Sequence, residues 1–427
     1  MLSRRSFITT AAGAGVGACM VQAMQAAVPR PEAPPLELAA DETYWRTVAA
    51  QYDLPQEVIQ LEHGNWGVMS KPVLSAYERH QHMVNRLGSF YARREFRSDF
   101  ERVRRRVAAV LGVDSREIAL TRGATEALQA LIGGYNRLRS GDAVLYADLD
   151  YDSMQEAMEW LRLRRGVHVI RIALPEPASH QSLIDAYAAA LDAHPRVRLI
   201  LLTHVSHRTG LVLPVKEILA LARERGMDAI VDSAHAWGQI DFRLRDLGVE
   251  FAGLNLHKWI GAPIGVGVLY IRRDRIRDVD PFMSPEAEPD DIDARVHTGT
   301  ANFAAFLAAQ DALDFHEAIG GTPAKEARLR FLRDLWAEHL RGWEPLQILT
   351  PEDKRLTCGI TSFRIRGRTG VEENAAICRV LHERFGIFTV HRAGVAGGAC
   401  VRVTPAPFTP KEHIEHLVRA LETIART

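Results

Sequence analysis

The sequence predicts an α/β protein with two domains. The larger is built on a mostly parallel sheet of the seven-stranded type, and a smaller α+β domain follows at the C-terminus. From about residue 115, strand-like apolar runs alternate with helix-like segments, as in a parallel sheet with helices on both faces. After about residue 300 this alternation gives way to longer helices. The chain has 427 residues, 47% of them hydrophobic, which is enough for one large and one smaller domain.

Seven apolar runs are expected to form the strands of the larger sheet. They lie at 117–121, 142–151, 167–175, 197–206, 227–235, 251–257 and 265–273. The third and fourth of them are mostly apolar and rich in β-formers, of the type that forms buried strands. Ligands of parallel sheets bind at the carboxyl ends of the strands, so the residues that end these runs are candidates for a site.

Helices are expected where apolar residues recur at intervals of three and four. They lie within 122–138, 153–166, 214–226, 302–319, 322–340 and 371–385, at the C-terminus, and within 41–110. Three further β-like segments, CGITSFRIRG, GIFTVHRA and ACVRVTP, give the C-terminal domain its α+β character.

The charge balance excludes some classes of partner. Lysine plus arginine equals aspartate plus glutamate, 53 each, so no overall field attracts nucleic acid or an anionic membrane. After the N-terminal segment, no run approaches the roughly 18 apolar residues of a membrane span. We therefore expect no nucleic-acid partner and a protein that is not embedded in a membrane.

The N-terminal residues look like a targeting signal. Ser3-Arg4-Arg5-Ser6-Phe7-Ile8 resembles the twin-arginine (Tat) export signal, and the Ala/Gly-rich segment after it is weakly hydrophobic. The alternative is a chance arginine pair in a disordered tail. The Tat interpretation predicts export of the folded protein to the periplasm by the Tat machinery.

The domain limits follow from these segments. We predict a signal peptide over 1–27, cleaved between Ala23 and Ala27, and a proline-rich leader over 28–60. A large cofactor-binding domain follows over 61–300, and the small domain over 301–427.

The cysteines predict no metal site. Outside the signal, Cys358, Cys378 and Cys400 show no C-x-x-C spacing, so neither zinc nor a disulfide framework is indicated. An oxidising compartment permits one disulfide among them, which the sequence does not specify.

Lys258 and Asp232 are the residues most expensive to bury, because each ends or follows an apolar strand. They could form a simple buried salt bridge. They also match what pyridoxal 5'-phosphate (PLP) requires: a lysine amine for a Schiff base and an aspartate that keeps the pyridine nitrogen protonated.

The segment TRGATEAL supplies a place for the cofactor phosphate. Gly123 permits close approach of the backbone, and Ala124 and Thr125 open a helix directly after a strand, where backbone N–H groups favour anions. Thr125 could equally be an ordinary N-cap residue, and the two roles are compatible. Tyr151, just past another strand end, could stack on the cofactor ring.

Together, IVDSAHAWGQID, LNLHKWIGAPIGVGVLY and the upstream GATEA resemble the class V aminotransferase group of fold type I PLP-dependent transferases, which includes isopenicillin N epimerase-like proteins and cysteine desulfurases. The resemblance covers roughly residues 60–425. It implies catalytic roles for Lys258, Asp232, His235 and Tyr151. It implies cofactor contacts for Ala124, Thr125, Tyr151, His207, Asp232, His235, Asn255, His257, Lys258 and Thr300.

The same resemblance implies a substrate site and a dimer. Arg402 matches the arginine that holds the substrate α-carboxylate, and Asn65 falls in the segment that borders the substrate. Thr300, in HTGTANFAAF, matches the residue that reaches a phosphate in the partner subunit, which implies a homodimer with composite active sites.

Two departures bear on the reaction. His207 stands where desulfurases usually carry asparagine. Desulfurases also need a cysteine on a mobile loop, whereas Cys400 lies only two residues before Arg402, next to a short glycine-rich link. Desulfurase activity is therefore disfavoured.

Export together with this family pattern is similar to the periplasmic PLP-dependent enzymes of pyoverdine maturation. That similarity implies a small peptide substrate, a siderophore precursor whose N-terminal glutamate becomes a succinamide. The alternatives are an epimerase or aminotransferase acting on a free or peptidyl amino acid, and a non-catalytic PLP-fold binding protein.

Overall fold

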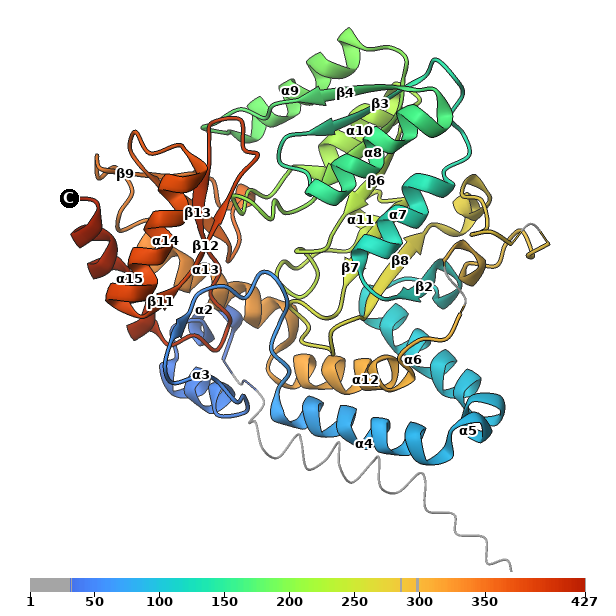
Figure 1. The fold of residues 1–427 in the computed structure, drawn as a ribbon, viewed down its shortest axis with the longest axis horizontal. Helices are drawn as coiled ribbons and strands as arrows, with labels where there is room; N and C mark the ends of the chain where they lie inside the picture. The colour runs from blue at the N-terminus through green and yellow to red at the C-terminus, as the bar shows by residue number, and fades with distance from the viewer. Residues whose placement is uncertain (1–30, 32, 285, 297–298, 427) are drawn as a thin grey trace, which may run out of the picture.

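The computed structural model describes residues 31, 33–284, 286–296 and 299–426. The predicted signal peptide, 1–27, lies outside the described residues. In Figure 1 a large sheet with helices on both faces lies beside a smaller unit that contains the C-terminus.

The core of the larger unit is a seven-stranded sheet among the described residues, with the order β2-β8-β7-β6-β5-β3-β4. The strands are β2 (Ile118–Thr121), β3 (Ala143–Ala147), β4 (His168–Ile172), β5 (Val197–Thr203), β6 (Asp228–Asp232), β7 (Phe251–Asn255) and β8 (Gly267–Ile271). Only β8 runs antiparallel to its neighbours, β2 and β7. The predicted mostly parallel sheet is confirmed.

Alternate residues of the strands enter two separate hydrophobic cores, one on each face of the sheet. In β3, Val144 and Tyr146 belong to the core that includes Leu128 and Met158, whereas Leu145 belongs to the other core. This alternation is the two-residue period of a strand, and it explains why helices cover both faces.

One strand differs from its prediction. The run at 167–175 was expected to be a buried strand, but β4 is the last strand of the sheet and His168 and Arg171 are exposed. The apolar run is therefore an edge strand, whose polar side chains face solvent.

The helices of the larger unit follow the expected segments, apart from α9 and the four-residue α11. They are α4 (Lys71–Leu87), α5 (Ser89–Arg94), α6 (Phe96–Leu111), α7 (Ala124–Gly134), α8 (Asp152–Arg165), α9 (His180–Ala193), α10 (Val215–Glu224), α11 (Leu244–Leu247) and α12 (Phe303–Ala318). The sequence analysis did not anticipate α9. Its start is marked by a capping box between Ser179 and Ser182.

The smaller unit is α+β, as predicted. An antiparallel sheet with the order β12-β13-β10-β9 packs with helices around its own hydrophobic core. The elements are α13 (Gly321–Ala337), β9 (Leu346–Ile348), β10 (Thr361–Ile365), α14 (Val371–Phe385), β11 (Ile387–Phe388), β12 (Val390–Arg392), β13 (Cys400–Val403) and α15 (Lys411–Ile424).

The predicted leader also contributes to this smaller unit. It contains α2 (Pro35–Leu38), α3 (Glu42–Ala49) and β1 (Ile59–Gln60), and β1 pairs in parallel with β11. Arg328 of α13 is buried, and it donates to the carbonyl of Ala39 at 2.9 Å and contacts Glu42. Figure 1 shows these N-terminal helices, in blue, beside the C-terminal elements, in red.

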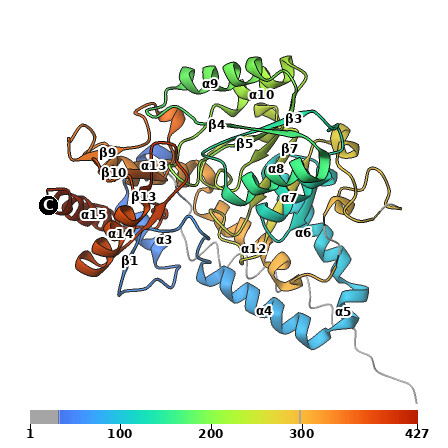
Figure 2. The same cartoon turned by 45° about the horizontal axis from the view of Figure 1, so that its top comes forward.

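Helix α12 lies just beyond the predicted domain boundary at residue 300, yet it packs along α4 and α6 of the larger unit. Figure 2 shows α12 above α4, away from the small sheet. The ring of Phe96 in α6 stacks on Phe303 at the start of α12, with 3.8 Å between ring centroids. The exact domain limits stay a prediction.

In the part of the chain that the structure describes, no helix is both long and apolar enough to cross a membrane.

Candidate active site

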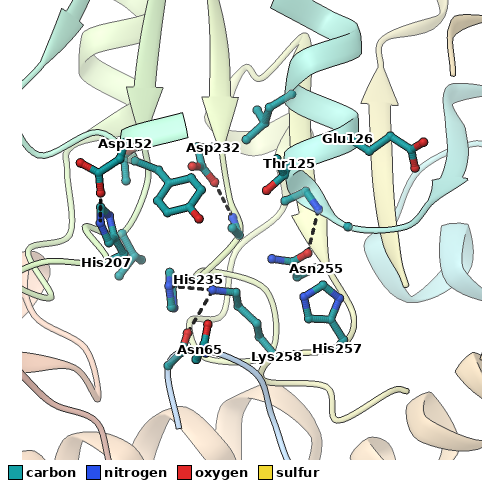
Figure 3. A pocket seen from close by; sticks show the side chains of 18 of the residues that line it. Asn65, Thr125, Glu126, Asp152, His207, Asp232, His235, Asn255, His257 and Lys258 are labelled. Carbon is teal, nitrogen blue, oxygen red and sulfur yellow. Dashed lines mark hydrogen bonds and ion pairs between the residues drawn. The ribbon is translucent and has the colours of Figure 1, made fainter. Parts of the chain in front are cut away.

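A cavity of about 760 Å³ lies at the carboxyl ends of the central strands, where the smaller unit meets the sheet. Every predicted site residue except Thr300 lines it. The lining includes Asn65, Ala124, Thr125, Tyr151, His207, Asp232, His235, Asn255, His257, Lys258 and Arg402. Figure 3 shows Lys258 between His235 and His257, with Asp232 and Thr125 across the cavity.

Lys258 is held without a direct carboxylate partner. It follows β7 by three residues, and its Nζ lies 3.0 Å from the carbonyl oxygen of Gly64 and 3.0 Å from Nε2 of His235. Burial, assisted by the positive charge of Arg402, lowers the pKa of Lys258 from 10.5 to about 7. A neutral amine at this pKa is a nucleophile and a proton acceptor near neutral pH.

Asp232 ends β6, beside Thr203 at the end of β5. Its Oδ1 accepts a hydrogen bond of 2.9 Å from the backbone N–H of Ala234, and burial raises the pKa of the carboxyl. The ion pair with Lys258 that the sequence left open does not form, because Lys258 Nζ hydrogen-bonds to Gly64 and contacts His235 instead. The carboxylate therefore stays free to face a cationic group in the cavity.

His235 is a buried imidazole placed against the lysine. Burial holds its pKa well below 6.5, with the charge of Lys258 as a further cause, so the ring is neutral. Its backbone carbonyl accepts a hydrogen bond of 2.6 Å from Gln239 Nε2, and its Nδ1 is buried without a protein partner. A neutral ring in contact with an amine can pass a proton to or from it.

The N-terminus of α7 faces the cavity, as predicted. Gly123 is the N-cap residue, so the alternative N-cap role of Thr125 is wrong. The side chain of Asn255 closes one side, because its Oδ1 accepts a hydrogen bond of 2.7 Å from the backbone N–H of Ala124. His257 Nδ1 bonds the carbonyl of Val266 at 2.9 Å, which fixes the ring.

A side chain on the glycine before α7 would crowd the residues around it. A Cβ on Gly123 would lie 3.1 Å from Cε1 of His257 and 3.4 Å from Oδ1 of Asn255. A Cβ on Gly267 of β8 would lie only 2.5 Å from the Cα of Gly123. Close packing of these backbones brings Asn255 and His257 to the end of the helix, where helix N–H groups and imidazole favour an anion.

Tyr151 and His207 form the opposite wall. The two rings meet edge to face, with centroids 5.1 Å apart. His207 Nε2 lies 3.7 Å from Oδ2 of Asp152, and burial lowers the pKa of His207 to about 3. Asp152 also pairs with Arg208, whose Nη1 donates to the carbonyl of Ala393 at 2.7 Å. This wall therefore joins the larger unit to the smaller one.

Arg402 comes from β13 and is fully buried, but it is not free. Its Nη1 donates to the carbonyl of His207 at 2.6 Å, and its Nη2 is paired with the carboxylate of Glu62. Burial lowers the pKa of Arg402 to about 10. Arg392 of β12 also lines the cavity, with Nη2 3.5 Å from Glu62 Oε1.

The segment around Asn65 touches both the lysine and the arginine. A Cβ on Gly64 would lie 2.7 Å from Nη2 of Arg402, and one on Gly67 would lie 1.9 Å from the carbonyl oxygen of Lys258. A side chain at Gly67 would overlap the backbone of Lys258, and one at Gly64 would crowd the buried guanidinium of Arg402, so these glycines let the segment lie against both residues. Asn65 is exposed at the edge of the cavity.

Two sets of residues discussed from the sequence lie apart from this constellation, Thr300 with its neighbours and the cysteines. Thr300 is exposed and does not line the cavity, so its reach into a partner subunit stays a prediction. The adjoining His297 and Thr298 lie outside the described residues.

The cysteines Cys358, Cys378 and Cys400 are free thiols, and burial raises the pKa of each to about 11. None is a reactive thiolate at neutral pH.

Glu62 and Arg392 line or border the cavity but were not predicted as site residues from the sequence. Both lie within segments already discussed: Glu62 is three residues before Asn65, and Arg392 is the second-to-last residue of GIFTVHRA. A charged residue beside apolar strand residues is the signal that could have found them. Their pairing with Arg402 depends on long-range contacts that spacing does not reveal.

The residues of this cavity fit PLP. Lys258 is a desolvated amine for covalent attachment, and Asp232 is a buried carboxylate suited to a protonated pyridine nitrogen. The N-terminus of α7, with Thr125 and His257, suits the phosphate. When bound, PLP supplies an electron sink for bonds at the α-carbon of an amino acid.

Relatives of known name match this chain along nearly their whole length. The chain is 30% identical over 404 residues to isopenicillin N epimerase of Streptomyces clavuligerus, covering 89% of this chain and 98% of that protein. It is 28% identical to isopenicillin N epimerase of Amycolatopsis lactamdurans, covering 90% of this chain and 99% of that protein.

Solved structures show the fold. The cysteine desulfurase CsdA from Escherichia coli matches with a TM-score of 0.74 at 20% identity, over 90% of this chain and 98% of that one. A mutant of the cystine C-S lyase C-DES with glycine covalently linked to its PLP cofactor matches with a TM-score of 0.74 at 21% identity, over 87% and 98%. The fold is that of fold type I PLP-dependent enzymes.

The family model described as aminotransferase class-V matches residues 69–421. With the fold, the cofactor-binding residues and the full-length relatives, this match places the protein among PLP-dependent enzymes that act on amino acids. The chain belongs to the aminotransferase class-V family.

Proposed function

We propose that the protein is a periplasmic enzyme, exported folded by the Tat machinery, that acts at the α-carbon of the N-terminal glutamate of a pyoverdine-type siderophore precursor and converts it to a succinamide. The general part of this proposal depends mainly on one observation, the contact of 3.0 Å between Lys258 Nζ and His235 Nε2 inside the cavity. The particular substrate and the location are supported by the sequence, through the twin-arginine pattern at Arg4-Arg5.

The proposed reaction balances with dioxygen as the oxidant. The reaction requires a free α-carboxylate, so the glutamate is joined to the rest of the precursor through its side-chain carboxyl. The bond between the α-carbon and the α-carboxylate breaks and releases carbon dioxide. One oxygen atom of dioxygen forms the new amide carbonyl, and the other leaves as water. The amine nitrogen stays on the former α-carbon as the amide nitrogen, so one glutamate residue and one dioxygen give one succinamide, one carbon dioxide and one water.

The protein's own residues provide proton transfer and water exclusion in this scheme. Lys258, with a pKa of about 7, accepts or returns a proton at the reacting carbon near neutral pH. His235 is neutral and in contact with the amine, so it can share that proton. His207, Arg402 and His235 are nearly fully buried, which limits water beside the reacting groups.

The thiols support a reaction other than sulfur transfer. Cys400 lies in β13, fully buried, and burial raises its pKa to about 11. A persulfide acceptor needs an accessible thiolate. This is why we do not propose desulfurase activity, although cysteine desulfurases share the fold.

A second candidate is epimerisation or transamination of a free or peptidyl amino acid. The isopenicillin N epimerases favour it, since they match along 98–99% of their length. A non-catalytic role in binding is a weaker alternative, because Lys258 and Asp232 are both present and both line the cavity.

Mass spectrometry of the product separates these candidates. Purified holoenzyme is incubated with a pyoverdine-type precursor that carries N-terminal glutamate, with and without dioxygen. The proposal expects a lighter product that keeps its nitrogen and forms only with dioxygen. An unchanged mass with inverted stereochemistry would establish epimerisation, and loss of nitrogen would establish transamination. Lys258→Ala enzyme is the control for uncatalysed change.

Location is tested separately, by fractionation of cells that produce the full chain and a variant in which Arg4 and Arg5 are both replaced by lysine. The proposal expects the native chain in the periplasm and the variant in the cytoplasm. Equal distribution of both chains would contradict export through the Tat machinery.

A further inference from the structure

We propose that Glu62 is a specificity-determining residue: it occupies Arg402 and withholds it from the substrate, so that Arg392 is the cation that meets a substrate carboxylate. The inference rests on the proposed function in one respect only, that an amino acid enters this cavity. The arginine–glutamate cluster is defined here as Glu62, Arg392 and Arg402.

Glu62 is fixed by the backbone. Thr404 N donates to Leu61 O at 2.8 Å and His63 N donates to Thr404 O at 3.1 Å, so residue 62 lies in a short parallel bridge beside the end of β13. Its side chain is 6% exposed. A carboxylate held this way stays beside Arg402, two residues along from Thr404.

Arg402 has both terminal nitrogens engaged. Nη1 donates to the carbonyl of His207 at 2.6 Å, and Nη2 pairs with Glu62 Oε1. The backbone of Gly64 packs against the guanidinium, since a Cβ there would lie 2.7 Å from Nη2 and 2.9 Å from Cζ. A bidentate grip on a carboxylate needs two free donors on one edge. One N–H of each terminal nitrogen is already taken, so a substrate carboxylate would have to compete with Glu62 and the carbonyl of His207 for this guanidinium.

Arg392 is the available cation. Its side chain is 29% exposed, and its Nη2 lies at a loose 3.5 Å from Glu62 Oε1. Arg122 also lines the cavity, but two of its nitrogens contact one oxygen of Glu126, one of them at 3.0 Å. Arg392 is therefore the cavity arginine least committed to a protein carboxylate among the described residues.

The charges in the cluster balance with one substrate carboxylate. Two arginines and one glutamate leave one positive charge beside the cavity. Glu62 Oε2 is buried without a hydrogen-bond partner, as are Nε of Arg392 and Nε of Arg402, so the cluster is incomplete by itself. One substrate carboxylate bound to Arg392 would neutralise the cluster. A second substrate carboxylate would be repelled by the carboxylate of Glu62.

A pair of small probes measures this directly. L-Alanine and L-alaninamide differ only in the carboxylate, and their apparent dissociation constants with holoenzyme can be followed by the visible absorbance of bound PLP. The ratio of the two constants isolates the contribution of the carboxylate. Absence of the absorbance itself would contradict the cofactor assignment instead, so the two failures are distinguishable.

Replacing Arg392 and replacing Glu62 should change alanine binding in opposite directions. Arg392→Gln should weaken alanine binding about tenfold and leave alaninamide unchanged. Glu62→Gln should strengthen alanine binding about tenfold, because it releases Arg402. In the Glu62→Gln background, Arg392→Gln should cost less than it does in the native chain. Unchanged or weaker alanine binding in Glu62→Gln would overturn the proposal, because Glu62 would then only position Arg402.

Controls separate recognition from folding. Glu176→Gln breaks another largely buried pair, with Arg364, outside the cavity lining and should leave the alanine-to-alaninamide ratio unchanged. If Glu62→Gln does not load PLP, Glu62→Asp draws the carboxylate back by one methylene and should shift the ratio in the same direction by a smaller amount. A shift in the opposite direction would overturn the proposal.

Discussion

Two lysines with similar contacts, each to a backbone carbonyl and to a histidine ring, lie in different parts of this protein. Lys258 contacts the carbonyl of Gly64 and the ring of His235. Lys325, in α13, contacts the carbonyl of Trp259 and lies 3.0 Å from Nδ1 of His316. Burial lowers the pKa of each lysine from 10.5 to about 7.

The difference between them is access. Lys258 lines the cavity together with Asp232 and the N-terminus of α7, whereas Lys325 is 3% exposed and does not line it. His316 closes the other side of Lys325 and is itself bonded to Thr322 at 3.1 Å. The lowered pKa therefore reflects desolvation at both lysines and does not by itself identify a functional residue. Access to the cavity is what distinguishes Lys258.

The two lysines should differ most in what their replacement does to enzyme activity. Lys258→Ala should lose the visible absorbance of covalently held PLP and reduce turnover by on the order of 10²–10⁴, because the group that holds and moves the proton is gone. Lys325→Met should keep both. Absorbance spectra and rates of the purified variants test this, and a Lys325→Met enzyme without PLP would contradict the distinction.

For the free energy of unfolding, replacement of Lys325 should have the larger effect and replacement of Lys258 the smaller. Lys325→Ala should lower the free energy of unfolding by about 2–4 kcal/mol, since it leaves a void and takes the partner from Trp259 O and His316 Nδ1. Lys258→Ala, compared in the PLP-free proteins, should change it by less than about 1 kcal/mol, because its side chain faces the cavity. Denaturant titration measures both, and Lys325→Met is the control that keeps the volume.

The pH dependence of stability sharpens the same point. A lysine with a folded-state pKa of about 7 and an ordinary value of 10.5 binds fewer protons when folded, so its contribution to stability rises with pH from about 7 towards 10.5 and is lost as pH falls through 7. Lys325→Met should reduce this slope between pH 7 and 8.5 by up to about 1.4 kcal/mol per pH unit. Unfolding of wild type and variant across this range is the measurement, and parallel curves would contradict the lowered pKa.

The smallest expected effect concerns the N-terminus of α7, which lies in the cavity with Lys258 and has no counterpart beside Lys325. Asn255→Ala removes the acceptor of the Ala124 N–H at the end of α7 and should weaken PLP binding by roughly fivefold, about 1 kcal/mol. Equilibrium titration of apoenzyme with PLP measures it. Asn374→Ala, which removes hydrogen bonds to Arg368 and Gly370 in the smaller unit, should leave PLP affinity unchanged.

Local pattern was enough to predict much of the fold and of the site. The sharp change from the apolar run of β2 to Gly123 predicts the turn into α7, and a carboxylate at the end of β6 predicts Asp232 at the edge of the sheet. These features depend on neighbours in the sequence, so they are visible without a structure. All but one of the residues predicted for the site line one cavity.

The features that were missed depend on contacts between distant segments. Whether β4 is central or at the edge depends on the strand order, and an apolar run does not specify it. Helix α9 was missed because its alanines weaken the contrast between its faces, although Ser179 marks its start. In the sequence, Glu62 and Lys325 look like ordinary surface charges. They are buried because β13 packs beside Glu62 and Trp259 packs beside Lys325.

The pairing of β1 with β11 has a consequence for how the enzyme is made. The segment that carries Gly64, whose carbonyl receives Lys258, is anchored by strands that the ribosome produces near the very end of synthesis. A nascent or truncated chain that ends before β11 lacks both Phe388 and Thr404, the backbone partners of Leu61 and His63, so the lysine pocket stays open on that side. Cofactor capture would then report that translation has been completed.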